Sequence, residues 1–248
     1  HAFFDRTQFC FVFFVHLGNS KKQFQQSSNE AMIPRVKICC ISSLEEAGTA
    51  IRFGASALGL VGHMPSGPGV ISDELIAEIA HSVPPPVSTF LLTSETDADA
   101  IIHHHRKVRT NTVQIVDALQ SGTYSEIRRS LPGVKLVQVI HVTDESSVDE
   151  AQQIAPDVDA ILLDSGNPKL AVKELGGTGR THNWELSRRI VESVRVPVFL
   201  AGGLRPDNVR AAIEAVQPFG LDLCSGVRTE GKLDPFKLEQ FFKAVMQN

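Results

Sequence analysis

Short apolar runs alternate along the chain with longer segments in which apolar residues recur every three or four positions. The short runs predict buried strands, and the longer segments predict amphipathic helices. The expected strands occupy residues 35–41, 57–62, 87–92, 112–117, 135–142, 159–165, 196–203 and 220–226. The expected helices occupy residues 42–54, 71–83, 95–108, 123–131, 146–156, 183–194, 205–216 and 234–246.

Each of the eight expected strands is followed by a helix, which predicts parallel strands joined by crossover helices. Eight such units favour a closed (β/α)8 barrel, an α/β fold. An open doubly wound sheet is the alternative, because the number of strands is uncertain from one sequence. No linker-like segment interrupts residues 35–247, which indicates a single domain. Ser72 and either Ser42 or Ser43 are expected to cap the helices that follow them.

The first 31 residues do not continue this pattern. Their aromatic-rich run, residues 9–17, is too short to span a bilayer, and a polar segment follows it. We expect residues 1–31 to be a disordered or leader-like extension without a fold of its own; a targeting segment is the alternative. The barrel is then expected to occupy residues 32–248.

The composition, 42% hydrophobic and 21% charged residues, is typical of soluble proteins. A formal net charge of −4 argues against a nucleic-acid-binding surface, which would be basic. The cysteines Cys10, Cys39, Cys40 and Cys224 form neither a C-x-x-C metal motif nor a disulfide framework. We therefore expect reduced thiols, a cytoplasmic location, and no bound metal or membrane.

Histidines are the other metal candidates. His103, His104 and His105 are adjacent on an expected helix, so their side chains do not converge on one ion, and we expect a solvated helix face. His63 and His141 lie at or near strand ends, and each alone is weak evidence for a substrate contact.

Chemistry in a barrel occurs where strands end and the following loops begin. Asp164 comes at such an end, after four apolar residues. It is either a structural acid or a proton donor whose pKa is raised by partial burial. Its position alone does not separate these two roles.

Strand alternation places Lys37, Cys39 and Ile41 on one side of the first strand, and Cys40 on the other. A lysine in a core strand requires a polar partner. A buried cysteine is usually a small apolar residue, but a cysteine at a barrel mouth near cations can ionise and accept a proton. We interpret Cys40 and Cys224 as apolar residues, and Cys39, taken alone, in the same way.

Glycines end the last two expected strands. Gly202 and Gly203 precede a helix, and Ser225 and Gly226 follow the final strand. Backbone N–H groups of the loops after strands 7 and 8 of barrels frequently hold phosphate. Either pair alone favours a tight turn, but the two pairs together favour a phosphate site. The segment 176–179 lacks the G-x-G-x-x-G spacing of a dinucleotide site and is expected to be a flap or a further wall of this pocket.

Six segments in this order resemble the phosphoribosylanthranilate isomerase family, which are (β/α)8 enzymes of tryptophan biosynthesis. They are VKICCIS, ALGLVG, ILLDS, GGTGRTHNW, VFLAGGLRPDNV and DLCSGVRTEGKLD. The resemblance covers residues 36–245, and residues 164–234 are its most specific part. It implies an Amadori rearrangement of a phosphorylated small molecule, N-(5-phosphoribosyl)anthranilate, without metal or cofactor. The oligomeric state stays open between a monomer and a homodimer.

The resemblance also implies roles for individual residues. It places the general base at Cys39 and the general acid at Asp164, which would protonate the ribose ring oxygen. It implies a sugar contact for Asp222. The residues that it places at or near the phosphate are Gly177, Gly179, Arg180, Gly202, Gly203, Ser225 and Gly226.

Some positions depart from the family pattern. Cys40 replaces the glycine that usually follows the base. No arginine stands in the segment 65–69, and no histidine stands in the segment 114–117, so the side that binds the aromatic acid is altered. Arg180 or Arg228 is a hypothetical replacement for the missing cation. These departures keep two alternatives open: a related barrel enzyme acting on another phosphosugar conjugate, and a non-catalytic barrel that binds a phosphorylated ligand.

Overall fold

The computed structural model describes residues 33–65, 67–166 and 181–247. The expected extension at residues 1–31 lies outside these ranges, and so do Gly177, Gly179 and Arg180. Within them, no helix combines the length and the apolar character that a membrane span needs.

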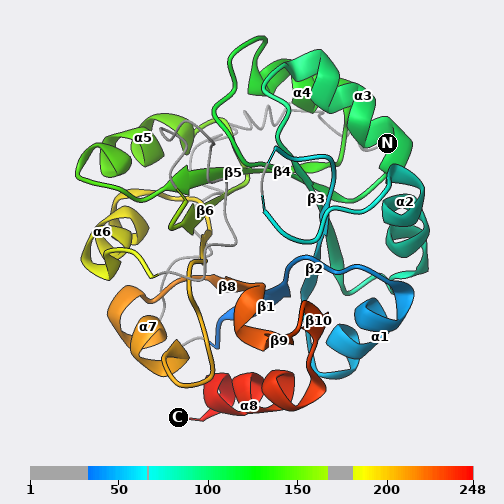
Figure 1. Cartoon of the computed structure of the whole chain (residues 1–248). Coiled ribbons are helices and arrows are strands. Elements are labelled where there is room, and N and C mark those ends of the chain that lie inside the picture. The colour runs from blue at the N-terminus through cyan, green and yellow to red at the C-terminus, as the bar shows by residue number, and fades with distance from the viewer. Residues whose placement is uncertain (1–32, 66, 167–180, 248) are drawn as a thin grey trace, which may run out of the picture. The chain divides into compact units, whose positions relative to one another are not determined.

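Eight parallel strands close into a barrel in chain order, and the helices lie outside this ring (Figure 1). The first strand pairs with both the second and the eighth, which closes the sheet. The predicted (β/α)8 barrel is confirmed, and the open sheet is excluded. The strands are β1 (Arg35–Ile38), β2 (Ala57–Val61), β3 (Ser88–Thr93), β4 (Thr112–Ile115), β5 (Lys135–His141), β6 (Ala160–Asp164), β7 (Val198–Leu200) and β8 (Gly220–Leu223).

The helices follow the strands as the apolar periodicity predicts. They are α1 (Leu44–Arg52), α2 (Asp73–Ser82), α3 (Ala98–Val108), α4 (Tyr124–Ser130), α5 (Ser146–Ile154), α6 (Trp184–Ser193), α7 (Val209–Val216) and α8 (Pro235–Met246). A short 3-10 helix, η2 (Ser225–Val227), and a two-stranded antiparallel sheet of β9 (Arg228–Thr229) and β10 (Lys232–Leu233) follow β8. These last three elements are too short to carry a periodic pattern and were not predicted from the sequence.

Side-chain caps explain where several helices begin. Ser43 and Ser72 accept hydrogen bonds from backbone N–H groups in the first turns of α1 and α2, which confirms Ser72 and selects Ser43. The helix expected from residue 205 begins only at Val209, because Arg205 and Asn208 form a turn in which the Asn208 side chain accepts from the Arg205 N–H.

The strands separate two apolar layers. One side of each strand packs against the helices, and the other fills the barrel interior. Outward residues include Ile38, Leu58, Leu60, Leu91, Ile140, Ile161, Leu163 and Leu221. Inward residues include Ala57, Val61, Phe90, Leu92, Val137, Val139, Leu162 and Phe199.

The first strand ends earlier than predicted, and this changes the side that two residues face. Cys40 has a φ of 60°, in the left-handed region. It therefore joins Cys39 in the interior cluster, while Ile41 packs in the outer layer. The prediction that Ile41 shares a side with Lys37 and Cys39 was wrong, since strand alternation stops where the backbone turns. A side chain in this conformation costs about 1–2 kcal/mol relative to glycine.

Candidate active site at the barrel mouth

A buried ion pair lies inside the barrel below its mouth. Lys37 and Asp222 are Cα partners on β1 and β8, and the Lys37 ammonium is 2.8 Å from Asp222 Oδ1. The ammonium also lies 5.3 Å from the centre of the Phe90 ring. Burial alone would lower the pKa of Lys37, but the charge and hydrogen bond of Asp222 outweigh it and raise that pKa. Asp222 is thus the polar partner that a core lysine requires.

The Cys39 thiol lies beside this cation. Gly59 on β2 faces both groups: a Cβ added to it would stand 2.8 Å from Cys39 Sγ and 2.9 Å from Lys37 Nζ. The bare backbone of Gly59 therefore leaves the space in which the sulfur and the ammonium approach each other. A cation next to a thiol stabilises negative charge on the sulfur, so this geometry suits a sulfur that accepts a proton.

Asp164 is a buried carboxyl at the C-terminal end of β6. It follows the inward residues Ala160 and Leu162 at the strand period of two, so its side chain faces the interior. Burial raises the pKa of Asp164, and the nearby carboxylate of Asp222 acts in the same direction. A hydrogen bond of 2.7 Å from the Ser165 N–H to Oδ1 opposes this only in part. The arrangement favours a carboxyl that holds a proton and can donate it.

His141 occupies the equivalent place on β5 and is the Cα partner of Asp164. Its Nε2–H donates to the Val116 carbonyl at 3.0 Å, so Nδ1 is the ring nitrogen left for another partner. Among the described residues this Nδ1 is buried without a hydrogen-bond partner. In the sequence, His141 alone was weak evidence for a substrate contact. Its place two residues after the inward Val139 was the signal that it faces the mouth.

The two predicted glycine segments lie together. Gly202 and Gly203 have φ of 83° and 62°, which a residue without Cβ adopts freely. Gly226 packs directly on the same loop, because a Cβ there would stand 1.9 Å from the Leu204 carbonyl oxygen. Ser225 begins η2 and is exposed. The loops after β7 and β8 thus form one continuous glycine-lined surface at the mouth.

Arg228 does not face the mouth as a free cation. Its side chain is only 8% exposed and pairs with Glu46 of α1 at 2.9 Å. It also donates to the carbonyls of Cys39, Cys40 and Gly231. The side chain therefore ties β9 to the end of β1, and this argues against Arg228 as the missing cation. The other candidate, Arg180, lies outside the described residues.

The three adjacent histidines of α3 do not form a wholly solvated face, which corrects one expectation. His105 is buried and its ring Nε2 donates to the Thr110 carbonyl at 2.7 Å, while His104 lies 3.1 Å from Asp73. Packing of α3 against the barrel and α2 decides this, and one sequence did not show which helix face was covered. Within the described ranges, no three His, Cys, Asp or Glu side chains are grouped to hold a metal ion.

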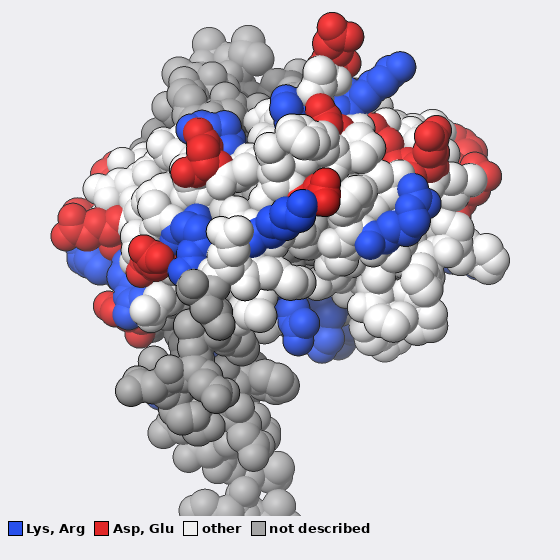
Figure 2. Space-filling model, turned by 90° about the horizontal axis from the view of Figure 1, so that it is seen from below, with Lys and Arg blue, Asp and Glu red and all other residues white. Residues whose placement is uncertain are grey.

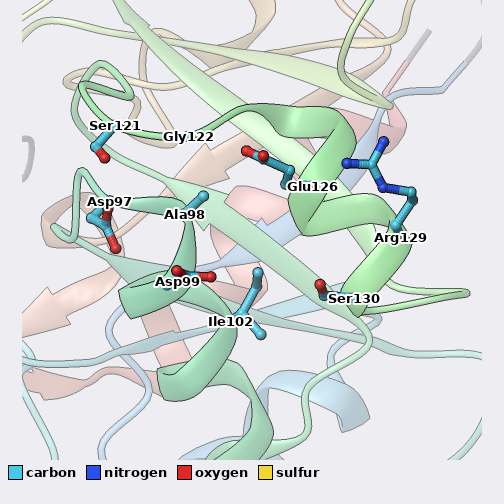
Figure 3. Close-up of a pocket in the computed structure, with 9 residues that line it drawn as sticks. All are labelled: Asp97, Ala98, Asp99, Ile102, Ser121, Gly122, Glu126, Arg129 and Ser130. Atoms are coloured by element: carbon cyan, nitrogen blue, oxygen red, sulfur yellow. The ribbon is translucent and has the colours of Figure 1, made fainter.

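A pocket of about 250 Å³ opens outside the barrel wall, between α3 and α4 (Figure 3). Two of the acids that line it have structural roles: Asp97 caps α3, and Glu126 forms the capping box of α4. None of the inward-facing mouth residues lines it. The full lining is Asp97, Ala98, Asp99, Ile102, Ser121, Gly122, Glu126, Arg129 and Ser130.

The surface charge is mixed on the side of the described residues seen in Figure 2. Lys and Arg lie interspersed with Asp and Glu there, without a stripe of one sign on that face. The site with unusual chemistry is therefore the barrel mouth, where a polar interior meets glycine-lined loops.

Comparisons with known proteins match nearly the whole barrel. A family model described as N-(5'phosphoribosyl)anthranilate (PRA) isomerase matches residues 36–244. The N-(5'-phosphoribosyl)anthranilate isomerase of Methanocella arvoryzae is 35% identical over 208 residues, which are 84% of this chain and 95% of that protein.

Two solved structures are also similar. One is a phosphoribosyl anthranilate isomerase in complex with reduced 1-(o-carboxyphenylamino)-1-deoxyribulose 5-phosphate, at 28% identity and a TM-score of 0.68. The other shows monomers generated from the dimeric isomerase of Thermotoga maritima, at 28% identity and a TM-score of 0.69. Each alignment covers 86% of this chain and 98% of the solved chain.

Proposed function

Because the chain belongs to the N-(5'-phosphoribosyl)anthranilate isomerase family, we propose that Cys39 and Asp164 carry out the two proton transfers of its reaction. The protein is an aldose–ketose isomerase of tryptophan biosynthesis that rearranges this phosphorylated substrate to a deoxyribulose 5-phosphate. Family membership sets aside the two alternatives, another phosphosugar conjugate and a non-catalytic barrel.

Asp164 is the general acid of the proposal. Its proton passes to the ribose ring oxygen, the ring opens, and the substrate becomes a Schiff base. Burial supports this role, since it raises the pKa of Asp164 and keeps the proton available. The Ser165 N–H holds Oδ1, so the carboxyl is oriented before the substrate binds.

Cys39 is the general base. As a thiolate it takes the proton from C2′ of the Schiff base, which gives an enolamine that tautomerises to the ketone. The place of the Lys37 ammonium beside the sulfur in the barrel interior supports this role. These two proton transfers involve neither metal nor cofactor.

The substrate phosphate is proposed to bind at the joined loops after β7 and β8. Gly202, Gly203 and Gly226 allow close approach to backbone N–H groups, and Ser225 starts a helical turn there. Asp222 is proposed to contact a sugar hydroxyl from the barrel interior. The proposed contributions of Gly177, Gly179 and Arg180 concern residues outside the described ranges.

One observation carries the assignment: Cys39, Lys37, Asp222 and Asp164 face one interior, and their charges act on each other. We further propose a cytoplasmic location, which the three free thiols of the described residues support. A homodimer is the favoured assembly over a monomer, since a similar isomerase is described as dimeric.

Replacing the two residues tests the proposal. Cys39→Ala and Asp164→Asn are each expected to lower kcat by roughly 10²–10⁴-fold, the usual contribution of one acid or base. Loss of substrate fluorescence measures turnover. Asp149→Asn, an exposed acid of α5, is the matched control and keeps full activity. Unchanged turnover in both active-site variants would remove the mechanism.

The Asp164→Asn variant also has an expected effect on stability. The folded-state pKa of Asp164 lies above its ordinary value of 3.8, so the folded protein binds the proton more tightly than the unfolded chain. Stability of the native protein therefore falls as pH rises from 3.8 through the folded pKa. Asn removes this loss, so urea unfolding should show a stability gain for the variant that is larger at pH 8 than at pH 4. A gain that shrinks with rising pH contradicts the assigned protonation.

A further inference from the structure

Two sulfur atoms meet where β1 and β8 end. Cys40 Sγ and Cys224 Sγ share a hydrogen bond at 2.7 Å, and both thiols are free. A disulfide bond is about 2.05 Å long and joins residues on adjacent chain segments such as these. Only a small movement therefore separates the two thiols from a covalent bond.

The two thiols differ in access. Cys40 is buried, and the loop after β2 covers it: a Cβ added to Gly69 would stand 2.4 Å from Cys40 Cβ. Cys224 is partly exposed at the mouth. A small reagent from solvent therefore meets Cys224 first.

The pKa values of the two thiols also differ, and the more exposed thiol has the lower pKa. The shared hydrogen bond lowers the pKa of Cys224 and raises that of Cys40. Arg228 adds positive charge beside Cys224, although burial opposes it. Of the two thiols, Cys224 is therefore the one that loses its proton more readily. This is the pairing of a reactive thiolate with a resolving thiol.

We propose that Cys40 and Cys224 form a redox pair, which closes to a disulfide under hydroperoxides and reopens with a dithiol. The Cys224 thiolate attacks a peroxide oxygen, the O–O bond breaks, and the oxygen released takes a proton to form water. Cys40 then attacks the resulting sulfenic acid, the S–O bond breaks, and the hydroxyl leaves as water with the proton of Cys40. With hydrogen peroxide, two thiols give one disulfide and two waters, and two electrons pass from sulfur to oxygen.

The disulfide acts on the site from both sides. Cys40 directly follows Cys39, and Cys224 directly precedes Ser225 and Gly226. Closing the bond draws these segments together by a fraction of an ångström, and shifts of about 1 Å cost up to roughly 10²-fold in rate. We expect the oxidised protein to turn over about tenfold more slowly, reversibly. This effect rests on the proposed roles of Cys39 and the glycine loops, whereas formation of the bond does not.

Peptide mapping tests the pair. The full-length protein is oxidised with hydrogen peroxide, and free thiols are blocked. Trypsin then gives one peptide of residues 38–52 and one of residues 211–228. Mass spectrometry is expected to find them joined with loss of two hydrogens, and separated again by dithiothreitol. Cys40→Ser and Cys224→Ser should each abolish the link, whereas Cys39→Ser should retain it.

The possible results separate the two proposals. A link through Cys39 or Cys10, or no link at all, overturns the redox pair. A correct link with unchanged turnover overturns its effect on catalysis. In reduced protein, Cys224→Ser should keep wild-type activity, and after peroxide it should show no loss that dithiothreitol restores. Full activity of Cys39→Ala would refute the assigned base and leave the mapping result intact.

Discussion

The mouth of the barrel has two unlike halves. We call the end of β6, β7, β8 and β1 the polar half, because it carries Asp164, Asp222, Lys37 and Cys39 together with the glycine loops. The end of β2 to β5 is the apolar half. Its inward residues near the mouth include Val61, Leu92 and Val116, with Gln114 and His141 as the polar exceptions.

This difference separates two tasks that one substrate imposes. Proton transfer and phosphate binding require charge and backbone N–H groups, while an aromatic ring requires an apolar wall. The missing arginine and histidine of the family pattern both belong to the apolar half, at residues 65–69 and 114–117. The residues proposed for proton transfer and phosphate binding therefore all lie in the polar half, whereas the departures from the family pattern lie in the apolar half.

The largest expected effect comes from opening the ion pair of the polar half. Lys37→Met leaves the buried Asp222 without its cation, which should destabilise the fold by roughly 3–5 kcal/mol. Urea unfolding measures this change. Lys135→Met is the matched control, since Lys135 is exposed and its pairing with Asp159 should contribute only about 0–1 kcal/mol.

A double variant separates charge from packing. Lys37→Met with Asp222→Leu removes both charges, so most of the lost stability should return. Turnover should not return, because both the cation beside Cys39 and the sugar contact proposed for Asp222 are gone. Equal stability of Lys37→Met and the native protein would show that the pair does not organise the polar half.

The fold was predictable because its signal is repeated. Each of the eight strand–helix units had its own apolar pattern, so an error of a few residues at one end changed nothing. The end of β1 was not predictable, since the left-handed backbone at Cys40 follows from contacts with the loop after β2 and with Cys224. The short sheet of β9 and β10 was not predictable for the same reason, because it is held in place by the pairing of Arg228 with Glu46, which is distant in the sequence.

The candidate site was predictable only at positions where the residue type itself indicated chemistry. An acid at a strand end and glycines after two strands indicated chemistry, and the family resemblance supplied the roles of Cys39 and Asp164. The partner of Lys37 could not be read from alternation, because it required the closure of β1 on β8. His141 and the inward turn of Cys40 likewise depend on which neighbours the closed barrel provides.

The next largest effect tests the phosphate side of the polar half. Gly226→Ala places a methyl group where the Leu204 carbonyl now lies, so the loops after β7 and β8 must separate. We expect KM to rise about tenfold or more, or roughly 1.4 kcal/mol of lost binding, with weaker inhibition by inorganic phosphate. Gly48→Ala in α1 is the control, because its Cβ would meet Arg52 at an ordinary 3.5 Å. An unchanged KM and unchanged phosphate inhibition would show that the phosphate binds elsewhere.

The smallest effect is expected in the apolar half. His141→Leu keeps the apolar character of the wall and removes Nδ1, which has no hydrogen-bond partner among the described residues and is proposed to bond the substrate. One such bond contributes about 1 kcal/mol, so kcat/KM should fall roughly fivefold. His63→Leu is the control, since His63 is exposed and should change little. If His141→Leu instead reduced turnover as far as Cys39→Ala, the division of the mouth would fail, because an essential proton-transfer group would then lie in the half assigned to binding the ring.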